Sequence, residues 1–175
     1  AAGKLPRIEG LEPAKIKKVG MLGGGVMGTG IVNVLLKGGF DAVLWEINEE
    51  ALEKALASIR KTFDYPIKQK KMTPADLENL LNNHLQTTTS LKDMKDVDLV
   101  IEAVLEDMQV KQEIWQQLEG ICRNDVIFAT NTSALPITEM ASILADPGRM
   151  IGMHFFNPAH RMQLLEVICA EKTSD

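Results

Sequence analysis

The chain has 175 residues, of which 45% are hydrophobic and 25% charged, and its formal net charge is −5. This length suits one domain with a sizeable core, and the acidic balance, without a run of Lys and Arg, argues against nucleic acid as the main partner. No apolar stretch approaches the length of a membrane span. The two cysteines, Cys122 and Cys169, lack metal-like spacing and cannot form a disulfide framework, which favours a reducing compartment.

The first pattern along the chain is a glycine-rich turn between an apolar strand and a helix. Residues 16–22 are mostly apolar, and the residues after the turn are apolar at helical spacing. Between them, Gly23, Gly25 and Gly28 have the G-x-G-x-x-G spacing of a dinucleotide-binding turn. The first glycine would permit the tight bend, the second would let a pyrophosphate approach the backbone, and the third would let the helix pack closely. We therefore expect cofactor contacts at Gly23, Gly25, Val26, Met27 and Gly28, at a helix N-terminus that favours anions.

An acidic residue ends the second predicted strand. The apolar run from Phe40 to Trp45 is followed by Glu46, 23 residues after Gly23 (46 − 23). Dinucleotide-binding folds place an acid near this position, on the ribose hydroxyls. A carboxylate would bind both hydroxyls and repel a 2′-phosphate, and no Lys or Arg in residues 47–50 could receive one. We therefore expect NAD rather than NADP as the cofactor.

A helical excursion of about residues 49–83 follows the second strand. Asn48 is a candidate N-cap for its first helix, and Thr73, followed by proline, is typical of a new helix start. The excursion is basic at Lys68, Lys70 and Lys71. These lysines form either a solvated face or a contact to cofactor or coenzyme phosphates.

The rest of the chain alternates strands and helices. We expect strands at residues 85–89, 97–102, 126–129, 150–154 and 164–169, and helices at about 108–121 and 136–144. This alternation, with several wholly apolar strands, predicts an α/β fold with a doubly wound, mostly parallel sheet of the Rossmann type. Ligands bind such sheets at the carboxyl ends of the strands, so the polar residues there should converge on one edge. These residues are Glu46, Glu102, Asn131, Ser133 and His154.

The candidate catalytic base is a histidine, because imidazole exchanges a proton near neutral pH. Of the three histidines, we place His84 at the surface and His160 on a loop. His154 ends an apolar strand, where an unpaired imidazole would only close that strand. Glu166 lies within the apolar run of residues 164–169, where an unpaired carboxylate would be costly to bury. We therefore expect Glu166 to pair with His154 from the neighbouring strand, to fix the imidazole tautomer and to stabilise the imidazolium formed in turnover.

Three segments of the chain resemble the 3-hydroxyacyl-CoA dehydrogenases. They are residues 23–30, Asn131-Thr132-Ser133, and residues 152–158 together with Glu166, twelve positions after His154 (166 − 154). The resemblance covers nearly the whole chain from about Lys15 onward. It implies oxidation of the L-3-hydroxyacyl group of a CoA thioester to the 3-ketoacyl group with reduction of NAD, the third step of fatty-acid β-oxidation.

The resemblance also implies roles for single residues. His154 would be the general base and Glu166 its partner. Ser133 would bind the substrate oxygen in catalysis, and Asn157 would be a further substrate contact. Cofactor contacts are implied at Glu46, Glu106, Lys111 and Asn131, and Glu106 and Lys111 match positions that touch cofactor or substrate. The family usually has aspartate where this chain has Glu46.

The resemblance finally implies a domain organisation. We expect residues 1–14 to be a linker or terminal extension and residues 15–175 to be the NAD-binding domain. The family's second, all-helical domain closes over the acyl chain and mediates dimerisation, and it is absent from this sequence. We therefore expect this chain to bind NAD but to turn over poorly alone. The expected substrate is an acyl-CoA, and the full-length protein would be a homodimer or part of a multifunctional complex, in the cytoplasm or else in the mitochondrion or peroxisome.

Two alternatives remain open. One is a different hydroxy-acid dehydrogenase or imine reductase of the same fold, which would leave the His154–Glu166 pair unexplained. The other is a non-catalytic module that binds NAD for structure or regulation.

Overall fold

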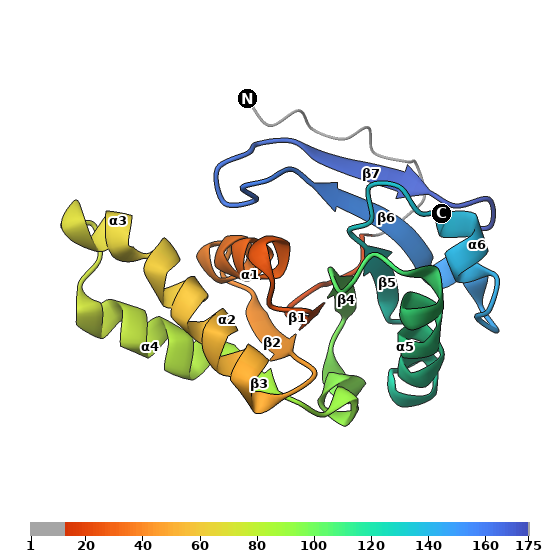
Figure 1. Cartoon of the computed structure of the whole chain (residues 1–175), viewed down its shortest axis with the longest axis horizontal. Helices are drawn as coiled ribbons and strands as arrows, with labels where there is room; N and C mark the ends of the chain where they lie inside the picture. Colours follow the sequence, from red (N-terminus) through yellow and green to blue (C-terminus); the bar gives the residue numbers. More distant parts are fainter. Residues whose placement is uncertain (1–12, 175) are drawn as a thin grey trace.

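The computed structural model describes residues 13–174, drawn in colour in Figure 1. The linker expected at residues 1–14 lies outside this range except for its last two residues. No helix among the described residues is long and apolar enough to cross a membrane.

The described residues form one seven-stranded sheet with the strand order β3-β2-β1-β4-β5-β6-β7. The strands are β1 (Lys18–Leu22), β2 (Asp41–Trp45), β3 (Leu85–Thr88), β4 (Leu99–Glu102), β5 (Ile127–Thr130), β6 (Met150–Phe155) and β7 (Leu165–Cys169). All neighbouring pairs are parallel except β6 and β7, which are antiparallel. The predicted doubly wound, mostly parallel sheet is therefore confirmed.

Helices cover both faces of the sheet (Figure 1). They are α1 (Val26–Lys37), α2 (Glu49–Thr62), α3 (Asp64–Lys68), α4 (Pro74–His84), α5 (Met108–Ile121) and α6 (Ile137–Ala141). Short 3₁₀ helices span Leu91–Asp96 and Pro147–Arg149. One core cluster joins α1, α2 and α4 to the sheet, and a second joins α5 and α6 to its other face. The central strands are thus buried on both sides, which explains their continuous apolar runs.

The predicted starts of two helices are confirmed by their side-chain caps. Asn48 Oδ1 accepts the Ala51 N–H at 2.9 Å at the start of α2. At the start of α4, Thr73 Oγ1 accepts the Asp76 N–H and the Asp76 carboxylate accepts the Thr73 N–H, a complete capping box. Lys68, Lys70 and Lys71, which lie between these helices, are exposed. Both alternatives for these lysines, a solvated face and a phosphate contact, stay open.

Among the elements predicted after residue 89, two are shorter than expected by two residues or more. The strand predicted at 97–102 begins only at Leu99, because the Val97 N–H donates to the Met94 carbonyl of the preceding 3₁₀ helix. The helix predicted at about 136–144 ends at Ala141, since the chain continues in tighter turns, with the Leu144 N–H bonded to the Ala141 carbonyl.

The expected burial of the run at residues 164–169 is wrong. Every residue of β7 is exposed, including Val167 at 56% and Ile168 at 40%. β7 is the last strand of the sheet, beyond the strands that the two core clusters cover. Its apolar side chains therefore lie on an open part of the described surface, and burial is not what gives Glu166 a partner.

Candidate active site

The glycine turn between β1 and α1 has the close contacts that its spacing predicts. Gly23 has φ +89°, in the left-handed region that favours glycine. A Cβ on Gly28 would lie 1.8 Å from the Gly23 carbonyl oxygen, so the first turn of α1 sits directly on this bend. A Cβ on Gly25 would meet nothing within 4 Å, which leaves the backbone open where a pyrophosphate is expected. The turn therefore fits a dinucleotide. The contacts of its individual residues to the phosphates stay predictions.

The start of the helix that follows has a partial positive charge, which favours a bound anion. α1 starts at Val26 with Gly25 as its N-cap, and its first turn contains no acidic residue. The N–H groups at the start of a helix have no partner within the helix and carry a partial positive charge. A diphosphate bound there would accept these N–H groups without repulsion from a neighbouring carboxylate.

Glu46 stands beside the same turn, at the end of β2. Its carboxylate accepts the Gly24 N–H at 2.5 Å and the Ile47 N–H at 3.1 Å. A carboxylate offers about four lone-pair positions, so two bonds leave room for ribose hydroxyls. Gly24 is itself constrained, because a Cβ there would lie 2.4 Å from the Ala55 Cβ. The sequence pattern missed this fourth glycine, since the spacing rule contains only three.

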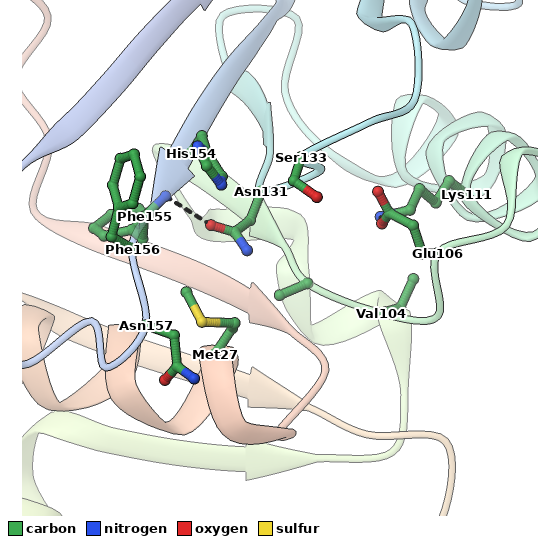
Figure 2. Close-up of a pocket in the computed structure, with 11 residues that line it drawn as sticks. Met27, Val104, Glu106, Lys111, Asn131, Ser133, His154, Phe155, Phe156 and Asn157 are labelled. Atoms are coloured by element: carbon green, nitrogen blue, oxygen red, sulfur yellow. Dashed lines mark hydrogen bonds and ion pairs between the residues drawn. The ribbon is translucent and has the colours of Figure 1, made fainter.

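A cavity of about 400 Å³ opens at the carboxyl edge of the sheet, next to the turn (Figure 2). Residues predicted to bind cofactor or substrate line it: Met27, Glu106, Lys111, Asn131, Ser133, His154 and Asn157. The strand register explains the convergence, because Leu22 lies opposite both Trp45 and Glu102, and Glu102 opposite Thr130. The structure thus brings together most of the predicted residues, with Glu46 outside the cavity beside the turn.

His154 and Glu166 are held together by the register of the last two strands. They lie directly opposite each other in the β6–β7 pair, and His154 Nδ1 is 2.8 Å from a Glu166 carboxylate oxygen. An ionised carboxylate only accepts hydrogen bonds, so a neutral imidazole in this contact carries its proton on Nδ1 and keeps a lone pair on Nε2. The predicted contact is confirmed, although its stated reason is wrong, because the Glu166 side chain is 48% exposed.

The backbone around His154 is fastened to the neighbouring loop. The Phe155 N–H donates to Asn131 Oδ1 at 2.9 Å, which is the dashed line in Figure 2. The Phe156 ring lies 4.7 Å from the imidazole, centroid to centroid. Because Asn131 Oδ1 accepts the Phe155 N–H, the NH₂ group of Asn131 is the part of its amide that can donate to a ligand.

A buried ion-pair cluster forms the opposite wall of the cavity. Lys111 Nζ lies 2.6 Å from Glu102 and 2.9 Å from Glu106, and the Lys111 and Glu102 side chains are at most 1% exposed. Burial alone would raise the pKa of the Glu106 carboxyl. Hydrogen bonds from Thr132 and Lys111, the Lys111 charge and the Ser133 N–H outweigh it and hold that pKa below its usual value. Glu106 is therefore an anion at neutral pH. The role of Lys111 at a ligand stays a prediction, and its pairing with Glu102 was missed.

The other two histidines lie away from the cavity lining. His84 ends α4 and pairs with Asp41 at 2.7 Å, at the start of β2, and is half exposed as predicted. His160 lies on the loop after β6, also as predicted. Its burial lowers its pKa, and the charges of Arg161 and Lys37 lower it further.

The described residues contain no cluster of three or more His, Cys, Asp or Glu side chains that could hold a metal ion.

Known proteins are similar to this chain in sequence and architecture. Residues 18–175 match the family of the 3-hydroxyacyl-CoA dehydrogenase, NAD binding domain. A fatty acid oxidation complex subunit alpha from Shewanella oneidensis is 43% identical over 167 residues, 95% of this chain and 24% of that protein. The crystal structure of (S)-3-hydroxybutyryl-CoA dehydrogenase from Ralstonia eutropha has 39% identity and a TM-score of 0.87 over 92% of this chain and 56% of that one. The 3-hydroxybutyryl-CoA dehydrogenase structure from Escherichia coli has 34% identity and a TM-score of 0.87, over 92% and 34% of the two chains.

The cofactor of the matched family is NAD, as the sequence predicted. The chain spans about a quarter of the length of the curated relatives that it matches. The shared region is thus the dinucleotide-binding part of larger proteins.

Replacing Gly28 by alanine is expected to disrupt the turn. The new Cβ cannot avoid the Gly23 carbonyl without moving α1, which should cost about 1–3 kcal/mol in the free energy of unfolding and weaken NADH binding. The matched control is Gly120→Ala in α5, where a Cβ meets nothing within 4 Å and stability should rise by about 0.5–1 kcal/mol. Chemical denaturation and NADH titration measure both variants. Equal changes of stability and of NADH affinity in the two variants would contradict the close contact at Gly28.

Glu46 is expected to set the preference for NADH over NADPH. Glu46→Gln keeps the size of the side chain but removes the charge that repels a 2′-phosphate, so the ratio of the two dissociation constants should shift about tenfold towards NADPH. Glu53→Gln, an exposed position in the middle of α2, is the control and should leave the ratio unchanged. Fluorescence titration with both cofactors measures the ratio. Tighter binding of NADPH than NADH by the unmodified chain would refute the assignment.

Proposed function

Because the chain belongs to the 3-hydroxyacyl-CoA dehydrogenase family through its NAD-binding domain, we propose that it carries the cofactor site and the catalytic base of an enzyme that oxidises L-3-hydroxyacyl-CoA. The product is the 3-ketoacyl-CoA of fatty-acid β-oxidation. The observation that carries the proposal is the His154–Glu166 contact of 2.8 Å at the cavity beside a dinucleotide turn. A non-catalytic module would have no use for an oriented imidazole at this place.

His154 is the proposed general base. Its Nε2 lone pair takes the proton of the substrate hydroxyl, while Glu166 holds the Nδ1 proton and stabilises the imidazolium that results. NAD, when bound, would accept the hydride from the carbon that bears this hydroxyl. A base positioned in this way contributes about 10²–10⁴ in rate. Removal of Glu166 would leave the imidazole free to rotate and to change tautomer.

Two polar residues on the neighbouring loops are proposed to orient the substrate. The exposed Ser133 hydroxyl lines the cavity on the loop after β5 and can donate to the substrate oxygen. Asn157, also exposed, follows β6 on the far side of His154 and is proposed as a second substrate contact. Figure 2 supports this arrangement, since both side chains lie around the same cavity as His154.

The proposal includes a partner domain. The chain spans 56% of the Ralstonia eutropha dehydrogenase chain, which leaves room for the expected helical domain over the acyl group. We propose that the full-length protein is a homodimer or part of a multifunctional complex, acts on acyl-CoA and works in the cytoplasm. The curated relatives from Shewanella carry the name of a complex subunit. A steady-state rate for this chain alone that equals the rate of the full-length protein would contradict the need for a second domain.

His154→Gln tests the proposed chemistry in the full-length protein. Turnover of 3-hydroxybutyryl-CoA, followed as NADH formation, should fall about 10²–10⁴-fold, because the base acts in the chemical step. The dissociation constant for NADH should change less than about twofold. His84→Gln is the control and should keep full activity, because His84 is a half-exposed histidine at the end of α4 that pairs with Asp41. Undiminished turnover of His154→Gln, or no turnover by the unmodified protein, would overturn the proposal.

A further inference from the structure

Glu102 is a buried carboxylate that the proposed reaction does not use. Its side chain is 0% exposed at the end of β4, and its carboxylate accepts hydrogen bonds from three different parts of the chain. The donors are Lys111 Nζ in α5 at 2.6 Å, the Val104 N–H after β4 at 2.7 Å and Thr130 Oγ1 in β5 at 2.7 Å. A carboxylate buried so fully is costly unless it is paired with a cation and hydrogen-bonded, so the three donors must stay in place around it.

The contacts continue into a closed ring. From Glu102 the ring passes through Lys111 to Glu106, which accepts the Thr132 hydroxyl, and the Thr132 N–H donates to Thr130 Oγ1 at 3.3 Å. Thr130 Oγ1 then returns to Glu102. The ring thus joins the end of β4, the first part of α5 and the loop after β5. Hydrogen bonds in such a network polarise one another and restrict the geometry of all members.

The ring restrains the loop residues next to its members. Along residues 130–133 the side chains alternate, so that Thr130 and Thr132, which are at most 5% exposed, belong to the ring. Asn131 and Ser133 face the other way and line the cavity. The Thr132 hydroxyl also accepts the Leu135 N–H at 3.0 Å, which holds the following turn. The position of the cavity wall therefore depends on where Glu102 holds Thr130 and Lys111.

We infer that Glu102 is a positioning residue that sets the nicotinamide side of the cofactor site. It acts through Lys111 and Thr130 on Asn131, Ser133 and Glu106 and touches no ligand itself. Glu102 ends β4, whereas Glu46 follows β2 on the opposite side of β1, where its carboxylate accepts the Gly24 N–H on the expected ribose side of the glycine turn. Loss of Glu102 therefore loosens the half of the site that lies against the cavity and leaves the adenosine half intact. The inference rests on NAD binding at this site and not on the proposed oxidation of hydroxyacyl-CoA.

The test compares NADH with ADP, which lacks the nicotinamide and its ribose. In Glu102→Gln the dissociation constant for NADH should rise about tenfold or more, since small misplacements of site groups have large effects. The constant for ADP should change less than about twofold. Glu113→Gln, an exposed acid in the middle of the same helix α5, is the matched control and should bind both as the unmodified chain does.

A second variant keeps the test decisive if Glu102→Gln does not fold. Thr130→Val removes the hydroxyl that donates to Glu102 and accepts the Thr132 N–H, with no change of charge and little change of shape, and should weaken NADH binding about fivefold with ADP unchanged. Unchanged NADH binding in the folded variants would overturn the inference. An equal loss for NADH and ADP would also overturn it, because Glu102 would then support only the general stability of the domain. Both measurements are titrations, so an inactive full-length enzyme would refute the proposed function and leave this result standing.

Discussion

The antiparallel pairing of β6 with β7 is the constraint on which the proposed chemistry depends. A parallel sheet brings the ends of its strands to one edge, but it cannot place a residue of the next strand opposite His154 after only twelve positions (166 − 154). The reversal does so, and the register then puts Glu166 on the same face as the imidazole. A shift of one residue would turn Glu166 to the other face and leave the imidazole of His154 without this partner.

The rest of the sheet supplies a second ligand region beside that pair. β1 lies between β2 and β4, so the chain leaves the sheet in opposite directions on either side of it. Loops at such a reversal separate and open a crevice, which is where doubly wound sheets bind nucleotides. Here the glycine turn and Glu46 stand on one side of the crevice and the cavity with His154 on the other. One ligand that reaches both sides would bring its reactive end to the imidazole.

The parts of this structure that depend on local sequence could be predicted. Apolar runs gave the parallel strands, Asn48 and Thr73 marked helix starts, and the glycine spacing located the turn. The ends of strands were enough to identify Asn131, Ser133 and His154 as neighbours, because parallel strands share an edge. The residue roles at a ligand stay predictions.

Features that depend on distant packing could not be predicted. The apolar composition of β7 suggested burial, yet an edge strand is covered only if another element reaches it, and sequence alone does not reveal that. The partner of Glu102 is also hidden, because a buried carboxylate can be neutralised by any cation that the fold brings near. Lys111 reaches it only because the N-terminal part of α5 lies over the end of β4. The ring through Thr130 and Thr132 follows from the same packing.

The most direct test of the proposed cofactor site is a crystal structure of the chain with NADH. We predict that the adenosine ribose lies at Glu46 and that the nicotinamide ring enters the cavity with its C4 towards His154, while Glu166 keeps its bond to Nδ1. A nicotinamide ring bound away from His154, or an imidazole that leaves Glu166 when the cofactor binds, would contradict this prediction.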